Sequence, residues 1–257
     1  MQKIEFTLTH SGAIAQIILN DGKGNVLDSI MMAELHQVFT ELKANKAVKL
    51  ITFEGAGKHF SFGASVAEHT KELAPAMLKG FIQLFRDVVD MQIPVLSKIS
   101  GQCLGGGLEL ALISNFMFAD KSAKMGQPEI ILGVFAPPAS ILLPLKIGYA
   151  KAEELLLTGR TITADEANSI GLLNGVFEDK ITMNAAIEEW IVANILPKSA
   201  SSLRFAVRAA RSVFNNLLIG KAEELEKMYV EELMESHDAN EGIAAFLEKR
   251  AANWEND

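Results

Sequence analysis

The chain has 257 residues, of which 49% are hydrophobic and 22% are charged, and its 24 basic and 32 acidic side chains give a net charge of −8. This is a globular composition, with enough residues for one large core or for a domain with an appendage. It excludes a disordered chain and a disulfide scaffold. The acidic balance argues against nucleic-acid binding, which needs a basic surface. The single cysteine, Cys103, predicts neither a disulfide nor a zinc or redox site.

The start of the chain does not have the pattern of a secretion signal, because residues 1–5 read MQKIE and no apolar segment follows. We therefore expect a cytoplasmic protein. The longest uncharged apolar stretch, residues 130–145, is interrupted by three prolines. It is too short and too broken to cross a bilayer, so no transmembrane segment is predicted.

The first half of the chain alternates strand and helix patterns. β-type runs at 3–9 and 13–19 predict a hairpin, and Asp28 can cap a helix that follows. Further along, strands are predicted at 48–53 and 94–99, with an amphipathic helix at 74–89 between them. This alternation predicts a largely parallel sheet flanked by helices.

The second half still mixes strands and helices at first and becomes purely helical beyond about residue 195. A glycine-rich segment at 101–107 leads into a short apolar helix, and two short strands are expected at 116–119 and 123–126. Thr163 and Glu166 form a capping-box pattern that predicts a helix ending near Gly171. Three further helices are expected, over residues 199–214, 221–236 and 239–252. We therefore divide the chain into an α/β core domain at 1–195 and a C-terminal helical region at 196–257.

Two glutamates stand alone among apolar and glycine residues. Glu109 is the only charge in GGGLELAL, and Glu129 is the only charge in MGQPEIILG. An unpaired buried carboxylate is costly and usually has a raised pKa, so such a pair could divide acid and base roles and hydrate a double bond. The alternative is structural, with each glutamate capping a helix or pairing with Lys124 or Lys146.

Two glycine-containing loops could bind an anion. Gly105, Gly106 and Gly107 leave backbone amides unshielded at the entry to a helix, although the glycines alone favour the alternative of a tight turn packed against its neighbour. The loop at 57–65 follows a predicted strand, where ligand loops of α/β sheets lie. Neither loop has the spacing of a nucleotide-binding motif, and no G-x-S-x-G elbow is present.

Four segments in order resemble the crotonase family, the enoyl-CoA hydratases and isomerases, over essentially the whole chain. They are GKHFSFGA at 57–64, GQCLGGGLELA at 101–111, GQPE at 126–129 and EGIAAFLEKR at 241–250, with twenty residues separating the two glutamates. The resemblance implies a crotonase-like spiral of ββα turns with a C-terminal helical region that forms a homotrimer or a homohexamer. It also implies an acyl-CoA thioester substrate.

The resemblance further implies roles for particular residues. The backbone amides of Phe62 and Gly106 would form an oxyanion hole for the thioester oxygen, and Glu109 and Glu129 would be the acid/base pair. Ala64 and Ser65 would contact the substrate, and Lys23 and Lys58 are candidates for holding the CoA phosphates. We expect no metal and no cofactor, because CoA is part of the substrate.

Three positions depart from the common family pattern: Phe62 replaces a small residue, Ser65 replaces an aspartate, and Pro137-Pro138 replaces a glycine-rich stretch. Together with Phe135, these departures resemble a subgroup that hydrates cyclic conjugated dienoyl-CoA esters in anaerobic benzoyl-CoA breakdown. We expect Phe62, Phe135 and Pro137 to wall a flat slot for a ring, unless they serve only core packing. Hydration of a straight-chain enoyl-CoA, double-bond isomerisation and a non-catalytic RNA-binding role remain the alternatives.

Overall fold

The computed structural model describes all 257 residues and shows a mixed α/β fold. β1 (Ile4–Thr9) and β2 (Ile14–Leu19) form the predicted antiparallel hairpin around a short 3-10 turn, η1 (His10–Gly12). The sheet continues in parallel through β3 (Leu50–Gly55), β4 (Val95–Ile99), β6 (Phe116–Asp120) and β9 (Gly175–Phe177). Its strand order is β1-β2-β3-β4-β6-β9, which confirms the largely parallel sheet.

A second, smaller sheet was not predicted. It contains β5 (Gln102–Leu104), β7 (Lys124–Gly126) and β8 (Thr161–Thr163), in the order β5-β7-β8. β5 directly precedes α3 (Gly106–Leu112), and β7 directly precedes the 3-10 turn η3 (Pro128–Leu132). Because β5 and β7 pair in parallel, the segments that follow them emerge on the same side.

Side-chain caps fix the starts of several helices. The Asp28 carboxylate accepts the Met31 amide at the start of α1 (Ser29–Ala44), as predicted. The Thr163 side chain accepts the Glu166 amide at the start of α6 (Ala164–Ser169), which also agrees with the sequence pattern. The other helices before residue 195 are α2 (Ala74–Met91), α4 (Pro137–Ile147), α5 (Tyr149–Thr158) and α7 (Lys180–Asn194), with a 3-10 turn η2 (Val66–His69) before α2.

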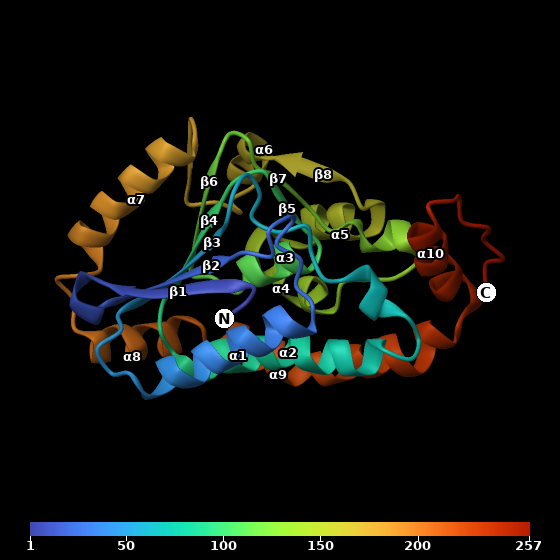
Figure 1. The fold of residues 1–257 in the computed structure, drawn as a ribbon, viewed down its shortest axis with the longest axis horizontal. Helices are drawn as coiled ribbons and strands as arrows, with labels where there is room; N and C mark the ends of the chain where they lie inside the picture. Colours follow the sequence, from blue (N-terminus) through green and yellow to red (C-terminus); the bar gives the residue numbers. More distant parts are fainter.

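Helices cover both faces of the large sheet (Figure 1). The main core lies on the face covered by α1 and α2, which pack against each other. On the other face, Met183, Ile187 and Ile191 of α7 pack against sheet residues such as Leu96 and Phe118. With both faces covered, the central strands are mostly apolar, as is usual for buried parallel strands, and the charges of Glu54 on β3 and Lys98 on β4 form an ion pair (2.5 Å).

The C-terminal region departs from the predicted helix boundaries. It consists of α8 (Ala200–Ala210), α9 (Ser212–Lys227), a π-helical turn η4 (Met228–Glu232), a 3-10 turn η5 (Leu233–Glu235) and α10 (His237–Glu248). α9 runs through the break expected near 215–220, because Leu218 and Ala222 are buried on either side of Gly220.

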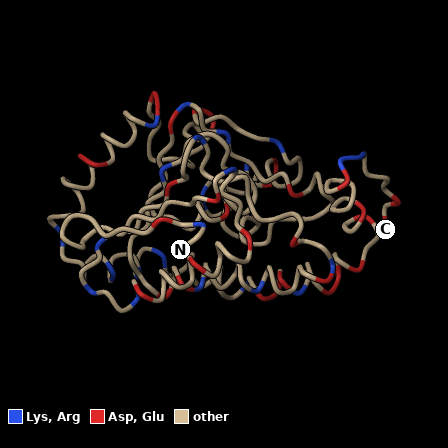
Figure 2. The backbone as a smooth tube through the Cα atoms, viewed as in Figure 1, with Lys and Arg blue, Asp and Glu red and all other residues tan.

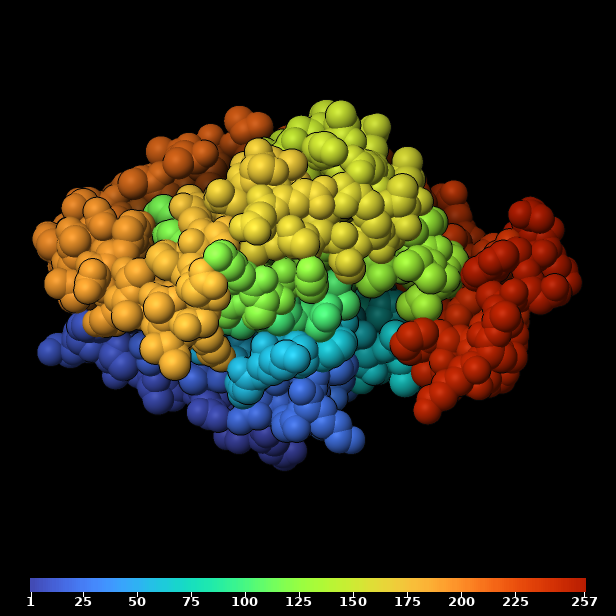
Figure 3. Space-filling view, turned by 90° about the horizontal axis from the view of Figure 1, so that it is seen from above, coloured from blue at the N-terminus to red at the C-terminus, as the bar shows by residue number.

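The C-terminal helices share the core of the rest of the chain. Leu218, Tyr229, Met234 and Ile243 belong to the same apolar cluster as the sheet and α1. α9 packs on α2 and α4, and α10 packs on η2 and η3, at one end of the molecule (Figures 1 and 3). Residues 237–248 therefore lie beside η2 and beside η3, the turn that follows β7.

Basic and acidic residues alternate along the backbone rather than gathering into one basic stripe (Figure 2). No helix combines the length and the apolar character that a bilayer crossing requires.

Candidate active site

One cavity gathers most of the residues that the sequence singled out. Phe62, Ala64, Gly106, Glu109, Glu129, Phe135 and Pro137 all line it. The remaining lining residues are mostly apolar: Gly63, Val66, His69, Met77, Leu78, Phe81, Gly105, Pro128, Leu132, Val134, Ala136, Tyr229 and Ile243. Ser65, Lys23 and Lys58 do not line the cavity. The two lysines lie exposed on the surface, whereas Ser65 uses its carbonyl to accept a hydrogen bond from His69 Nδ1 (2.7 Å).

Glu109 enters the cavity from the fourth position of α3 and is 4% exposed. Its Oε1 accepts the Ala139 amide at 2.8 Å, so it caps the start of α4. It has no ion pair, and Lys146 instead donates to the Ser114 carbonyl (3.0 Å). Glu109 therefore makes a capping contact of the kind that the structural alternative expected, whereas pairing with Lys146 is wrong.

Burial and the nearby charge of Glu129 raise the pKa of Glu109 well above its usual range, and the single Ala139 amide offsets only part of this effect.

Glu129 reaches the cavity from the second position of η3. Burial raises the pKa of Glu129 to about 7. The buried Gln127 amide, oriented with its nitrogen toward this carboxylate, lies 3.1 Å from each oxygen and 3.3 Å from the Gly105 carbonyl. Neither glutamate has a basic partner, and two such carboxyls facing one cavity favour a state in which the pair holds one proton at neutral pH.

The predicted oxyanion donor at Phe62 is wrong. Its amide already donates to the Gly24 carbonyl at 2.9 Å, so it is not free to bind a substrate oxygen. The free amide nearby belongs to Ala64. The Leu27 amide donates to the Gly63 carbonyl (2.9 Å), and the Leu27 carbonyl accepts the Ser65 amide (3.1 Å). In such an extended bridge the amide of Ala64, which lies between Gly63 and Ser65, faces away from Leu27.

The Ala64 and Gly106 amides lie next to each other. A Cβ atom added to Gly106 would stand 3.0 Å from the Ala64 nitrogen. Gly106 is the first residue of α3, so its amide has no acceptor within the helix. Gly105 beside it has φ 49°, and a side chain there would meet Glu129 Oε1 at 2.6 Å. The glycines thus permit two free amides and a carboxylate to approach closely.

Asn25, which the sequence analysis overlooked, fixes the loop that carries Ala64. Its buried Nδ2 donates to the carbonyls of Ala56 (3.1 Å), His59 (2.8 Å) and Phe60 (3.2 Å). Its own carbonyl accepts the Ser61 hydroxyl at 2.7 Å, and the same hydroxyl accepts the Gly63 amide at 3.1 Å. The only sequence signal was a polar residue directly after a glycine-rich turn.

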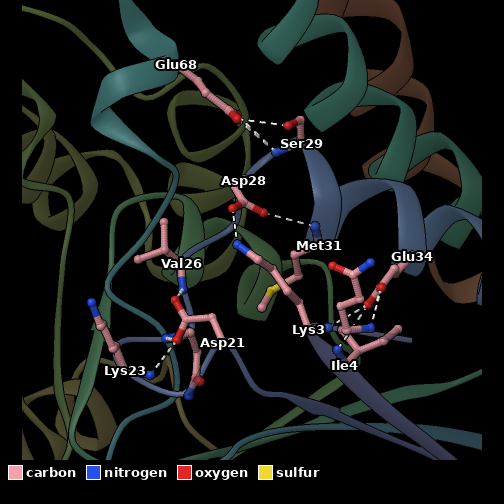
Figure 4. Close-up of polar contacts among 12 residues, drawn as sticks. Lys3, Ile4, Asp21, Lys23, Val26, Asp28, Ser29, Met31, Glu34 and Glu68 are labelled. Atoms are coloured by element: carbon pink, nitrogen blue, oxygen red, sulfur yellow. Dashed lines mark hydrogen bonds and ion pairs between the residues drawn. The ribbon is translucent and has the colours of Figure 1, made fainter.

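Asp21 in turn holds Asn25 in place. The Asp21 carboxylate accepts the amides of Lys23 (2.8 Å), Asn25 (2.7 Å) and Val26 (2.9 Å) (Figure 4). Burial opposes ionisation, but these three amides and the charge of Lys3 lower the pKa of Asp21. Glu68 of η2 accepts the amide and hydroxyl of Ser29, which ties the cavity wall to the start of α1 (Figure 4).

Aromatic rings shape the cavity at two places. The Phe62 ring packs edge-on against His59, with centroids 4.9 Å apart, and a Cβ on Gly24 would meet it at 2.7 Å. The Phe135 ring lies 5.4 Å from the Tyr229 ring. Pro137 lines the cavity as expected, whereas Pro138 is buried and does not line it.

Comparisons with known proteins show which family the chain belongs to. A profile of the enoyl-CoA hydratase/isomerase family matches residues 9–257. The chain therefore belongs to the enoyl-CoA hydratase/isomerase family, the crotonases. Among individual proteins, it is 47% identical over 249 residues to cyclohexa-1,5-dienecarbonyl-CoA hydratase of Thauera aromatica, covering 97% of this chain and 95% of that protein.

More general hydratases are also similar. A probable enoyl-CoA hydratase of Rhizobium meliloti (strain 1021) is 35% identical over 249 residues, covering 95% of each chain. The crystal structure of an enoyl-CoA hydratase from Mycobacterium avium superposes with a TM-score of 0.86 at 26% identity, covering 99% of each chain. The crotonase fold expected from the sequence is thereby confirmed.

Proposed function

We propose that this protein hydrates cyclohexa-1,5-diene-1-carbonyl-CoA to a hydroxycyclohexenoyl-CoA, a step of anaerobic benzoyl-CoA breakdown. The observation that carries the proposal is the pair of carboxyls, Glu109 and Glu129, which line one cavity without a basic partner, beside two free amides. The 47% identity to the Thauera aromatica hydratase supports the ring-shaped substrate.

In the proposed reaction, the Ala64 and Gly106 amides bind the thioester oxygen. Addition of water to the conjugated system places negative charge on this oxygen, and each preorganised donor can lower the barrier by roughly 3 kcal/mol. The water oxygen forms a bond to the ring carbon while one of its protons passes to the ionised carboxyl of the pair. The protonated carboxyl gives its proton to carbon, so the pair again holds one proton.

The substrate slot would lie between the Phe62 and Phe135 rings and Pro137. All three line the cavity, and the apolar wall continues through Met77, Leu78 and Phe81. A flat ring would be held by these surfaces, whereas an extended acyl chain would leave part of them uncovered. A straight-chain enoyl-CoA hydratase remains the second candidate, because the Rhizobium relative is a probable enoyl-CoA hydratase.

The decisive experiment compares substrates. Purified protein is assayed with the cyclic dienoyl-CoA and with crotonyl-CoA, and the proposal expects a kcat/KM that is higher for the cyclic ester by about tenfold or more. In ¹⁸O-labelled water the product should carry one label. A preference for crotonyl-CoA would favour the second candidate, and an isomerised product without label would favour isomerisation.

Three further features are part of the proposal. Lys23 and Lys58 would hold the phosphates of CoA near the mouth of the cavity, no separate cofactor or metal would take part, and the protein would act in the cytoplasm. The region 196–257 would carry the contacts of a homotrimer or of a homohexamer of two trimers. Light scattering of the purified protein would measure the mass, and a monomer would contradict this part.

A further inference from the structure

Tyr229 places a polar group in the cavity that the proposed reaction does not yet use. The residue is 1% exposed and lines the same cavity as Glu109 and Glu129, yet its hydroxyl has no hydrogen-bond partner. A buried hydroxyl without a partner is costly, and native proteins seldom leave one unless a ligand or water completes it. Only two other buried side-chain atoms lack a partner, on Thr9 and Asn184, and neither lines the cavity.

The local backbone and a neighbouring ring hold Tyr229 in a defined position. It lies in the π-helical turn η4, where the helix that follows α9 widens by one residue per turn. Such turns often occur at functional sites. The Phe135 ring packs against it at an interplanar angle of 59°, which limits rotation of the phenol.

The surroundings keep this phenol in its neutral, hydrogen-bond-donating form. Burial raises the pKa of Tyr229, and the charges of Glu129 and Glu109 raise it further. His69 also lines the cavity, but its Nδ1 is taken up by the Ser65 carbonyl (2.7 Å); the other polar groups are carboxyls that accept and backbone amides that would bind the thioester oxygen. The phenol is thus a neutral side-chain donor close to both carboxyls.

We propose that Tyr229 is a substrate-contacting residue whose hydroxyl donates a hydrogen bond to the water oxygen that becomes the hydroxyl group of the product. This inference rests on the proposed hydration. The phenol keeps its proton throughout, while the water proton passes to one carboxyl and the proton of the other passes to carbon. Its role is to hold the water at the correct face of the substrate, and the product hydroxyl after addition.

The test is Tyr229→Phe, which removes one oxygen and keeps the ring. We expect kcat/KM for hydration to fall by about tenfold or more, because one hydrogen bond to the reacting oxygen is lost. Binding of cyclohexanecarbonyl-CoA, a saturated ester that takes up no water, should stay within about twofold of wild type. The Tm should be unchanged or higher, because an unpartnered polar atom has been removed from the interior.

The chain offers a matched control in its other tyrosine. Tyr149 is 71% exposed, so Tyr149→Phe should change neither rate nor binding. A Tyr229→Phe rate within about twofold of wild type overturns the inference, as does a parallel loss of rate and of saturated-ester binding, which would mean a purely structural role. If wild type hydrates only crotonyl-CoA, the ring proposal fails, while the same comparison with crotonyl-CoA still tests Tyr229.

Discussion

The Ala139 amide donates to the Glu109 carboxylate at 2.8 Å from the third position of α4, a helix whose first two residues are Pro137 and Pro138. Proline has no amide hydrogen, so Ala139 is the first residue of this helix that can donate. The two prolines thus leave Glu109 with one amide donor from this helix, whereas other residues at these two positions could supply further amides. A carboxylate with a single donor in an apolar site keeps a raised pKa, as a proton-transferring group requires.

Replacing either carboxyl should strongly lower turnover while the site still binds a CoA ester. Glu109→Gln and Glu129→Gln should each lower kcat by on the order of 10² or more, because proton transfer is lost while the cavity keeps its shape. Steady-state kinetics and binding of a CoA ester measure the two effects separately. Glu231→Gln, at an exposed position, serves as control. Unchanged rates in both variants would refute the assignment of this pair.

The contact between Gly106 and Ala64 can be tested with one methyl group. Gly106→Ala places a Cβ 3.0 Å from the Ala64 nitrogen and 3.3 Å from the Phe81 ring, so it should separate the two amides and lower kcat by on the order of tenfold or more. Gly80→Ala in α2 meets nothing within 4 Å and should stabilise the protein by up to about 1 kcal/mol with full activity. A fully active Gly106→Ala enzyme would exclude this oxyanion site.

The raised pKa of Glu129 makes stability depend on pH in a defined direction. A carboxyl whose pKa is raised on folding, here from 4.5 to about 7, favours the folded state at low pH, and this contribution is lost as the pH rises through 7. Glutamine is neutral at every pH. At pH 8 we expect Glu129→Gln to raise the free energy of unfolding by on the order of 3 kcal/mol, with little difference near pH 4.

Urea unfolding of both proteins at the two pH values measures this difference. Equal stabilities at pH 8 would show that Glu129 ionises in the folded protein as easily as in water, which would remove the basis for an acid/base role.

Asn25 should be sensitive to the loss of its amide nitrogen. Asn25→Asp keeps the shape but turns a carboxylate toward three carbonyl oxygens, so we expect a loss of stability of about 2–4 kcal/mol and a lower kcat through displacement of the 56–64 loop. Asn45 is the control, because its Oδ1 only accepts the Ala47 amide and aspartate can do the same. Comparable stabilities of the two variants in urea would contradict the role given to Asn25.

Phe62 should influence which acyl group is accepted. Its ring lines the cavity and is 47% exposed, so Phe62→Ala enlarges the slot with little cost to the core. We expect the ratio of kcat/KM for the cyclic dienoyl-CoA over crotonyl-CoA to fall by about tenfold. An unchanged ratio would mean that the ring serves only to cover Gly24 and His59.

Local patterns predicted much of this fold. The β1–β2 hairpin, the Asp28 cap and the parallel order of the sheet follow from residues close together in sequence, and the structure confirms them. Glu109 and Glu129 were found because isolated charges among apolar residues are conspicuous, and they do line one cavity.

Long-range contacts explain which site residues were predicted wrongly or overlooked. Whether the amide of Phe62 or that of Ala64 is free depends on hydrogen bonds to Gly24 and Leu27, which are about 37 residues away in the chain and leave no local pattern. Tyr229 was overlooked because a single tyrosine in a helical stretch looks like any core residue. Its importance depends on the fold bringing it to the cavity.

Phe62 and Ile243 face the same cavity although most of the chain lies between them. On the ribosome, domains fold as the chain emerges, from the N-terminus onward. The sheet, α3 and η3 with their two carboxyls can assemble early, but the pocket has no closing wall until η4 and α10 have been made. A chain that stops before η4 and α10 would therefore carry both glutamates and still be inactive, so catalytic competence arises only after these two elements have been made.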